Sequence, residues 1–323
     1  MLTVKAELCQ RFYSEIDPVL EAMSASTTAL FFSVINIIQA LVILASNAFT
    51  IYVFVQRKLC LKRTAFLLIN LAVTDFLIGA TALLEIIFLS FRKMTVKAII
   101  YDEPVSAFQI SFSCSSLFCL VGISLERVYA VLWPYRHRTI STKFYIVNIA
   151  LAWIAGITIG VLYTLVSLDV IGKEANIPTE LALLCSLAIF VASYRAIRTR
   201  MNKTVLSLDA HNRHTEEQNM KLSRTLIIVT TLSLLLWVPA IVVSGVQVNC
   251  SPCSEAIVRL QIVSSTRVLH LSNSIVNPVV YSYRMPMFRE EMKKFLNKIR
   301  CFRCITSENT VQSGQLECFN SHL

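Results

Sequence analysis

The chain has 323 residues, of which 55% are hydrophobic and only 15% charged, whereas soluble domains carry about a quarter charged residues. Together with a mean hydropathy of +0.62, this composition excludes an ordinary soluble protein. Only seven glycines occur, and no P-loop, GxGxxG or HExxH motif is present, which argues against a nucleotide-binding or zinc-dependent enzyme.

Seven apolar runs are long enough to cross a membrane, since a spanning helix needs roughly 20 apolar residues. Backbone groups in lipid must pair within their own segment, which favours helices over open strands. The sequence therefore predicts an all-α membrane protein, a seven-transmembrane helix bundle. We expect its helices over residues 28–55, 65–91, 104–132, 143–167, 179–200, 222–248 and 257–281.

The distribution of lysine and arginine predicts the orientation in the membrane, because cytoplasmic loops are enriched in these residues. Residues 1–27 carry more acids than bases, whereas basic residues follow the first run directly. We therefore expect an extracellular N-terminus over 1–27, the bundle over 28–281 and a cytoplasmic tail over 301–323. The net charge of +10 then reports topology, and no nucleic acid is expected as a partner.

Asp75 lies in the middle of the second run, within NLAVTDFLIG. Ionisable residues at this depth are rare and usually functional. Neutral side chains with oxygen atoms are expected at a similar depth, and such a set around a carboxylate suits a small hard cation. The alternative is an acid that only hydrogen-bonds to its neighbours. The neutral candidates are Asn47, Ser116, Asn273 and Asn277.

Glu126 and Arg127 are adjacent near the cytoplasmic end of the third run, within SLERVYAVLWPYRHR. Neighbours on a helix do not face one another, but the Glu126 side chain can bend back to hold the guanidinium. Such a pair is switchable, because a competing partner for Arg127 can replace it. The alternative is an interfacial arginine whose charged end reaches the membrane surface.

Prolines interrupt the last two runs. Pro239 follows Trp237 in LLLWVPAIV, and Pro278 lies within Asn277-Pro278-Val279-Val280-Tyr281. Proline removes a backbone donor and kinks a helix, so each position is either a hinge or a static bend.

In this order the features resemble the rhodopsin-like (class A) G-protein-coupled receptors over nearly the whole chain. The resemblance implies a multi-pass plasma-membrane protein that passes the signal of an extracellular ligand, a peptide or small molecule, to a heterotrimeric G protein. It implies no enzyme activity and no required cofactor. The matching residues are Asn47, Leu71 to Asp75 (LAxxD), Glu126-Arg127-Val128 (D/E-R-Y), Trp153, Tyr194, Trp237-Val238-Pro239 (WxP) and Asn277 to Tyr281 (NPxxY).

The resemblance also implies roles for single residues. Arg127 would contact the G protein once the sixth helix moves outward. Asp75, Ser116, Asn273 and Asn277 would form a sodium pocket that favours the inactive state, with sodium as an allosteric ligand. Val128 and Asn219 depart from the family pattern at the inactive-state clamp, so we expect measurable basal activity.

Residues 285–300 read as a short amphipathic eighth helix along the inner membrane surface. Phe288, Met292 and Phe295 share one face, with basic residues beside them. Cys301 and Cys304 follow directly and are candidates for palmitoylation.

The usual family disulfide is missing, because Asp102 stands where the third-helix cysteine is expected and the loop 167–178 has no cysteine. These departures resemble melanocortin receptors and, more loosely, adenosine and cannabinoid receptors. The melanocortin resemblance implies an acidic pocket for ligand and calcium, in which Glu85 and Asp102 match two of three acids and Glu103 lies near the third. It also favours coupling to adenylyl cyclase.

The acids near the outer mouth favour calcium or a cationic or peptide ligand, and solvated acids are the alternative reading. Gln109 stands where amine receptors carry an aspartate, and Leu271 where opsins carry a lysine, so an amine and retinal are both disfavoured. Arg267 and His270 are expected to face the ligand pocket, although His270 is equally suited to packing.

Outside the cell, Cys250 and Cys253 pair with each other, or one of them pairs with Cys9; the sequence leaves both open. Two other protein classes fit the sequence less well. A seven-helix transporter or channel would need a path of intramembrane charges, and Asp75 is isolated. A catalytic membrane protein would need paired acids, a metal set or an activated nucleophile, and the sequence supplies none.

Overall fold

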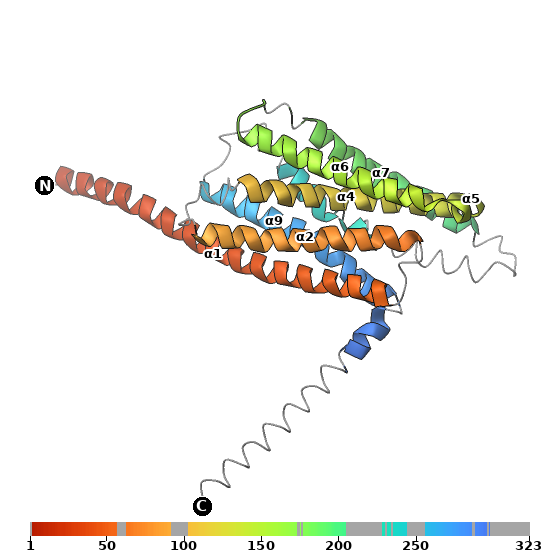
Figure 1. Ribbon diagram of the computed structural model, residues 1–323. Helices are drawn as coiled ribbons and strands as arrows, with labels where there is room; N and C mark the ends of the chain where they lie inside the picture. The colour runs from red at the N-terminus through yellow and green to blue at the C-terminus, as the bar shows by residue number, and fades with distance from the viewer. Residues whose placement is uncertain are drawn as a thin grey trace, which may run out of the picture. The chain divides into compact units, whose positions relative to one another are not determined.

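The computed structural model describes residues 2–56, 63–91, 103–172, 175, 177–204, 228–229, 231–233, 235–243, 256–285, 288–295 and 297. These residues are almost entirely helical and contain no strand (Figure 1). The named helices are α1 (Leu2–Gln56), α2 (Arg63–Phe91), α4 (Glu103–Leu132), α5 (Pro134–Thr139), α6 (Thr142–Ser167), α7 (Ile177–Thr204) and α9 (Ala256–Arg284).

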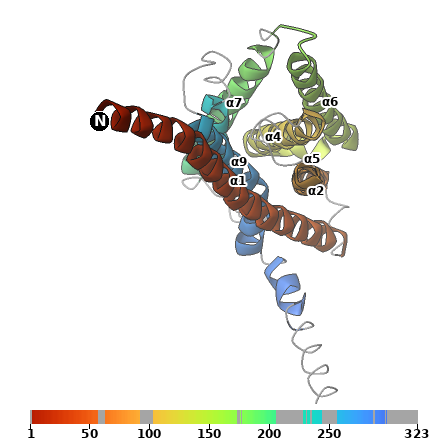
Figure 2. The same cartoon turned by 90° about the vertical axis from the view of Figure 1, so that its left-hand side faces the viewer.

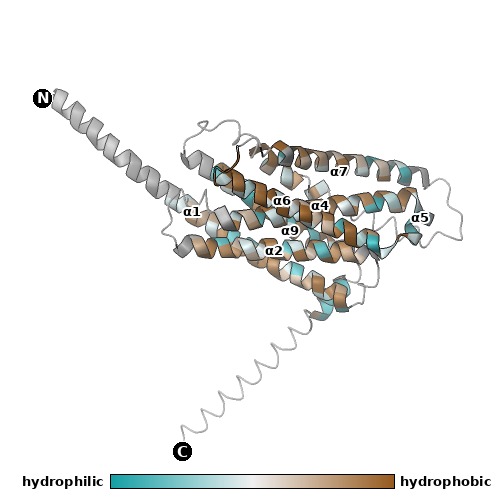
Figure 3. Cartoon of the chain, turned by 45° about the horizontal axis from the view of Figure 1, so that its top comes forward, coloured by the Kyte–Doolittle hydropathy of each residue, from teal (hydrophilic) through white to brown (hydrophobic). Residues whose placement is uncertain are grey.

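Five of these helices are long and apolar enough to cross a membrane within the described residues. Figure 3 shows hydrophobic residues along α2, α6 and α7. A shorter apolar helix, Thr231–Val243, lies within the sixth expected span. The five spans are Ser26–Gln56, Ala65–Phe88, Val105–Leu132, Thr142–Ser167 and Thr179–Arg200.

The helix α9 has the length of a span but a different composition. It carries Arg267, His270 and a run of amides and hydroxyls, and Asn273, Ser274 and Asn277 are buried. Polar side chains in a membrane helix face its neighbours rather than lipid, where they find partners. The seventh expected helix is therefore present with nearly the expected length, but it is less apolar than expected. Its buried polar side chains face the neighbouring helices.

The helix α1 begins at Leu2, well before the expected start of the first span at residue 28. Its first part contains Glu, Ala and Leu and no glycine, which favours helix, although Pro18 also lies within it and removes one backbone donor. The apolar span itself begins at Ser26, close to the expected boundary.

The helix α4 is central and packs against α2, α6 and α7 (Figure 2). Its contact with α6 is made by small residues. A Cβ added to Gly156 would overlap Ser115 Oγ, and one added to Gly160 would overlap Ser111 Oγ. Small residues allow helix backbones to approach closely in a membrane, where packing drives association.

The cross-links between α1, α2, α6 and α9 are hydrogen bonds rather than apolar contacts alone. Asn47 Nδ2 of α1 donates to the Ser274 carbonyl of α9 at 3.0 Å. Trp153 Nε1 of α6 donates to Asn70 Oδ1 of α2 at 2.9 Å. In a medium that supplies no water these bonds fix the relative positions of the helices.

The residues from Val279 onward form a second compact unit. Residues 288–295 are helical, and the ring of Phe288 lies 5.9 Å from that of Tyr281, centroid to centroid. Phe288 is buried, whereas Arg289, Lys293 and Lys294 are exposed. The described part of the expected eighth helix is thus helical; of its expected apolar face Phe288 is buried, whereas Phe295 is 48% exposed.

Candidate functional site

A buried carboxylate, Asp75, lies at the meeting point of α2, α4 and α9. Its side chain accepts hydrogen bonds from Ser116 Oγ at 2.8 Å, from Ser274 Oγ at 3.0 Å and from Asn277 Nδ2 at 2.6 Å. All four side chains are buried. The three helices therefore share one acid at their centre.

Buried asparagine oxygens on α1 and α9 have no hydrogen-bond partner among the described residues. They include Asn47 Oδ1, Asn273 Oδ1 and Asn277 Oδ1. An unpaired buried carbonyl is costly, and these oxygens are the ligand type that a small hard cation takes. The residues present therefore fit a sodium ion, with Asp75 as the one charged ligand.

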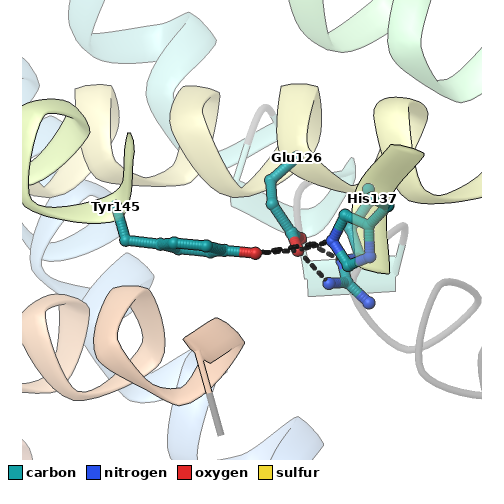
Figure 4. A network of polar contacts seen from close by, with 4 residues as sticks. Glu126, His137 and Tyr145 are labelled. Carbon is teal, nitrogen blue, oxygen red and sulfur yellow. Dashed lines mark hydrogen bonds and ion pairs between the residues drawn. The ribbon is translucent and has the colours of Figure 1, made fainter. Parts of the chain in front are cut away.

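A second acid, Glu126, is the centre of a polar network near the C-terminal end of α4 (Figure 4). Arg127 Nε and Nη2 donate to its two oxygens. His137 Nε2 of α5 lies 2.6 Å from Glu126 Oε1, and Tyr145 of α6 donates to the same oxygen at 3.3 Å. Glu126 and Arg127 are both buried, so the charged pair is shielded from solvent.

The short helix α5 brings His137 to this acid. The chain leaves α4 at Leu132, and Pro134 begins α5 at its first position, where a missing N–H is tolerated. The ring of Tyr129 contacts Trp133 and His137, with centroids 5.5 and 6.4 Å apart. The turn thus folds the basic segment back onto the end of α4.

A third acid, Glu85 of α2, pairs with Arg267 of α9. Arg267 Nη1 and Nη2 donate to its two oxygens, and Nη2 also donates to Gln109 Oε1 of α4 at 2.8 Å. Glu85, which the sequence offered as an open acidic ligand, is therefore neutralised within the bundle. Of the six ligand-pocket candidates, which are Glu85, Asp102, Glu103, Gln109, Arg267 and His270, the structure thus brings Glu85 and Gln109 into contact with Arg267.

Trp237 and Tyr194, two of the three aromatic residues predicted to take part in the activation switch with Tyr281, have contacts of their own. Trp237 is buried, and its ring meets His270 edge to face at 4.4 Å, which links the helical residues 235–243 to α9. Trp237 Nε1 has no hydrogen-bond partner among the described residues. Tyr194 accepts a hydrogen bond from Arg198, whose guanidinium also lies 5.8 Å from its ring centroid.

The remaining predicted site residues are only partly described. Pro278 lies inside α9 and Pro239 within the helical residues 235–243. Cys9 and Glu103 lie in helices, but their side chains fall outside the description, so both predictions stand as they were. The described residues hold no group of three metal-binding side chains of the His, Cys, Asp or Glu type. Asp102, Cys250, Cys253, Cys301 and Cys304 lie outside the described residues.

Sequence reasoning missed three members of these clusters: His137, Tyr145 and Ser274. Ser274 directly follows Asn273, so the polar run of α9 held a signal for it. His137 lies in a basic segment that indicates the membrane orientation. Its only other signal is the Trp133-Pro134 turn, which indicates that this segment folds back onto α4. Tyr145 is a buried aromatic residue among exposed neighbours at the start of α6.

Comparison with known proteins supplies a family for this arrangement. Residues 46–281 match the sequence model of the family described as 7 transmembrane receptor (rhodopsin family). The matched range contains all three acids and every helix from the later part of α1 to Tyr281.

Relatives of known identity are also receptors. The chain is 26% identical over 310 residues to trace amine-associated receptor 9 of Mus musculus, covering 85% of this chain and 87% of that one. It is 24% identical over 297 residues to lysophosphatidic acid receptor 1 of Bos taurus, covering 85% and 76%. With adenosine receptor A2a of Canis lupus familiaris the identity is 24% over 271 residues, covering 72% and 64%.

Proposed function

Because the chain belongs to the rhodopsin family of seven-transmembrane receptors, we propose that a cationic or peptide ligand acts through it on a heterotrimeric G protein to raise cyclic AMP. The family match confirms the predicted seven-helix bundle in the membrane, and the chain is a G-protein-coupled receptor rather than an enzyme, a transporter or a channel. The three relatives carry the names of three different ligands, so the family alone does not determine the ligand.

The observation that carries the proposed mechanism is the buried pair of Glu126 and Arg127 at the cytoplasmic end of α4. Arg127 is occupied by Glu126 in this state and is unavailable to a G protein. A G protein that offers Arg127 other partners binds the state in which the pair is open, and so shifts the population toward it. His137 and Tyr145 hold the acid on the side of α5 and α6 and favour the closed state.

The finer parts of the proposal rest on other features. Two features support a melanocortin-like receptor and, with it, coupling to adenylyl cyclase. Asp102 stands where the third helix usually has a cysteine, and the second outer loop is short. Glu85 supports a cationic ligand, because it is the buried acid nearest to the other ligand-pocket candidates. We place the N-terminus outside the cell and the C-terminus in the cytoplasm from the charge distribution.

Arg127→Ala tests the proposed function without a ligand. We expect cells that express the chain to contain more cyclic AMP than cells with an empty vector, and the variant to return it to the vector level. The reason is that Arg127 is the group proposed to contact the G protein. The measurement is cyclic AMP at matched surface expression. Equal levels in chain and variant would contradict both basal activity and this role of Arg127.

Sodium is expected to stabilise the receptor through Asp75. At ten times its dissociation constant, an ion bound only by the folded state adds about 1.4 kcal/mol. We expect the unfolding temperature of the purified protein to rise when sodium chloride replaces choline chloride, and Asp75→Asn to remove the rise. Asp169→Asn is the matched control, because Asp169 is exposed in a turn outside the spans. A sodium response that persists in Asp75→Asn would place the ion elsewhere.

A further inference from the structure

The ion pair between Arg267 and Glu85 lies where the helices α2, α4 and α9 meet. Its two ends differ in exposure: the Glu85 side chain is 2% exposed, whereas that of Arg267 is 24% exposed. Arg267 is therefore the more accessible residue of the pair, although its Nε is buried. A molecule that enters this site meets positive charge first and reaches the acid only by displacing the arginine.

Arg267 also retains an unused donor. Its Nε is buried and has no hydrogen-bond partner among the described residues, although Nη1 and Nη2 are both engaged. A guanidinium presents its donors as a planar fork that matches a carboxylate at two points. Once Glu85 has moved, the free Nε and one of the other nitrogens can donate hydrogen bonds to a second carboxylate.

Charge balance restricts what this site accepts. A ligand that brings only a cation to Glu85 leaves Arg267 buried without a counter-charge. A ligand that brings only an anion to Arg267 leaves Glu85 buried without a counter-charge. Stranding one member of a buried pair reduces affinity on the order of a hundred-fold or more. A ligand with both charges exchanges one ion pair for two and strands neither residue.

We propose that the ligand is a free amino acid, whose carboxylate binds Arg267 and whose ammonium group binds Glu85. The proposal rests on the receptor function above and specifies its ligand: the ammonium group supplies the cation proposed there, and a carboxylate is added. The two charges of an α-amino acid are separated by a single carbon, which suits two side chains that are in contact before the ligand arrives. Gln109, released from Arg267, is then available to either ligand group.

The contact between His270 and Trp237 links this site to the rest of the bundle. His270 is on α9, three residues beyond Arg267, and its ring lies against that of Trp237. This contact is the route by which a ligand that moves Arg267 would change the packing of the helical residues 235–243.

The test uses the purified full-length receptor with heterotrimeric G protein, and nucleotide exchange is the readout. The probes are the twenty L-amino acids, the amine that each gives on loss of its carboxylate, the acid that each gives on loss of its amine, and O-phosphoethanolamine. We expect at least one amino acid to raise exchange, with its amine and its acid at least a hundred-fold less potent.

Three results would overturn the proposal: an amine as potent as its amino acid, a response to O-phosphoethanolamine in place of any amino acid, or no response to any amino acid. The first leaves the proposed cationic ligand standing, and none of them affects the ligand-free comparison with Arg127→Ala. The failure of this inference is therefore distinguishable from failure of the proposed function.

A conservative variant separates carboxylate binding from a structural effect. Arg267→Lys keeps the charge but loses the two-point fork. We expect a 10- to 100-fold loss of potency for the amino acid and a much smaller loss for its amine, each measured against the variant's own ligand-free exchange. The control is Arg200→Lys, at an exposed position of α7. Equal losses for amino acid and amine would overturn the contact between carboxylate and arginine.

Discussion

Glu85→Gln is expected to destabilise the receptor strongly. It leaves the charge of Arg267 inside the bundle without its acid, and breaking a buried pair in this way costs about 3–5 kcal/mol. We expect the unfolding temperature of the purified protein to fall on the order of 10 °C. The measurement is a thermal unfolding curve in detergent, with ligand absent.

The double variant Glu85→Gln, Arg267→Gln is the informative control for this prediction. It removes both charges and leaves two amides that hydrogen-bond to one another, so we expect it to recover most of the lost stability. If the double variant is as unstable as the single one, the loss comes from packing around residue 85 and not from an unpaired arginine.

Glu126→Gln is expected to raise ligand-free nucleotide exchange about 5- to 30-fold. Hydrogen bonds to charged groups contribute about 1–2 kcal/mol more than neutral ones, so the amide holds Arg127 less firmly in the closed state. The freed arginine favours the state that binds the G protein. Exchange on purified G protein, at equal receptor concentration, measures the change.

Tyr145→Phe is the matched control for Glu126→Gln. It removes one neutral hydroxyl that contacts Glu126 at 3.3 Å and leaves the charges in place. We expect an increase in exchange below about five-fold. An unchanged or lower rate in Glu126→Gln would mean that the acid does not restrain Arg127, and the closed-state role of this network would be wrong.

The sequence was sufficient to predict the helices, because the length of an apolar run is a local property. Six of the seven expected spans coincide with named helices to within a few residues, apart from the longer start of α1. The Asp75 cluster was also within reach, since Ser116 and Asn277 were recognised by their place in a family pattern. The structure brings these residues into hydrogen-bond contact.

The pairing of charges was not predictable from the sequence. Glu85 and Arg267 are separated by 182 positions, and their contact depends on how α2 and α9 are rotated about their axes. The sequence indicates a cluster of acids at the outer end of the bundle that would bind a cation. The structure instead pairs one of these acids, Glu85, with Arg267. His137 was hidden for a related reason: its contact with Glu126 depends on the turn at Pro134 rather than on its own neighbours.

The outer side of α6 presents Ile146, Ile154 and Ile157, where any apolar side chain of similar size can meet lipid. Its inner side meets α4 through Gly156 and Gly160, where one added carbon overlaps a serine. A larger residue at either glycine therefore forces α4 and α6 apart, whereas an exchange of one apolar residue for another on the outer side leaves the distance between these two helices unchanged.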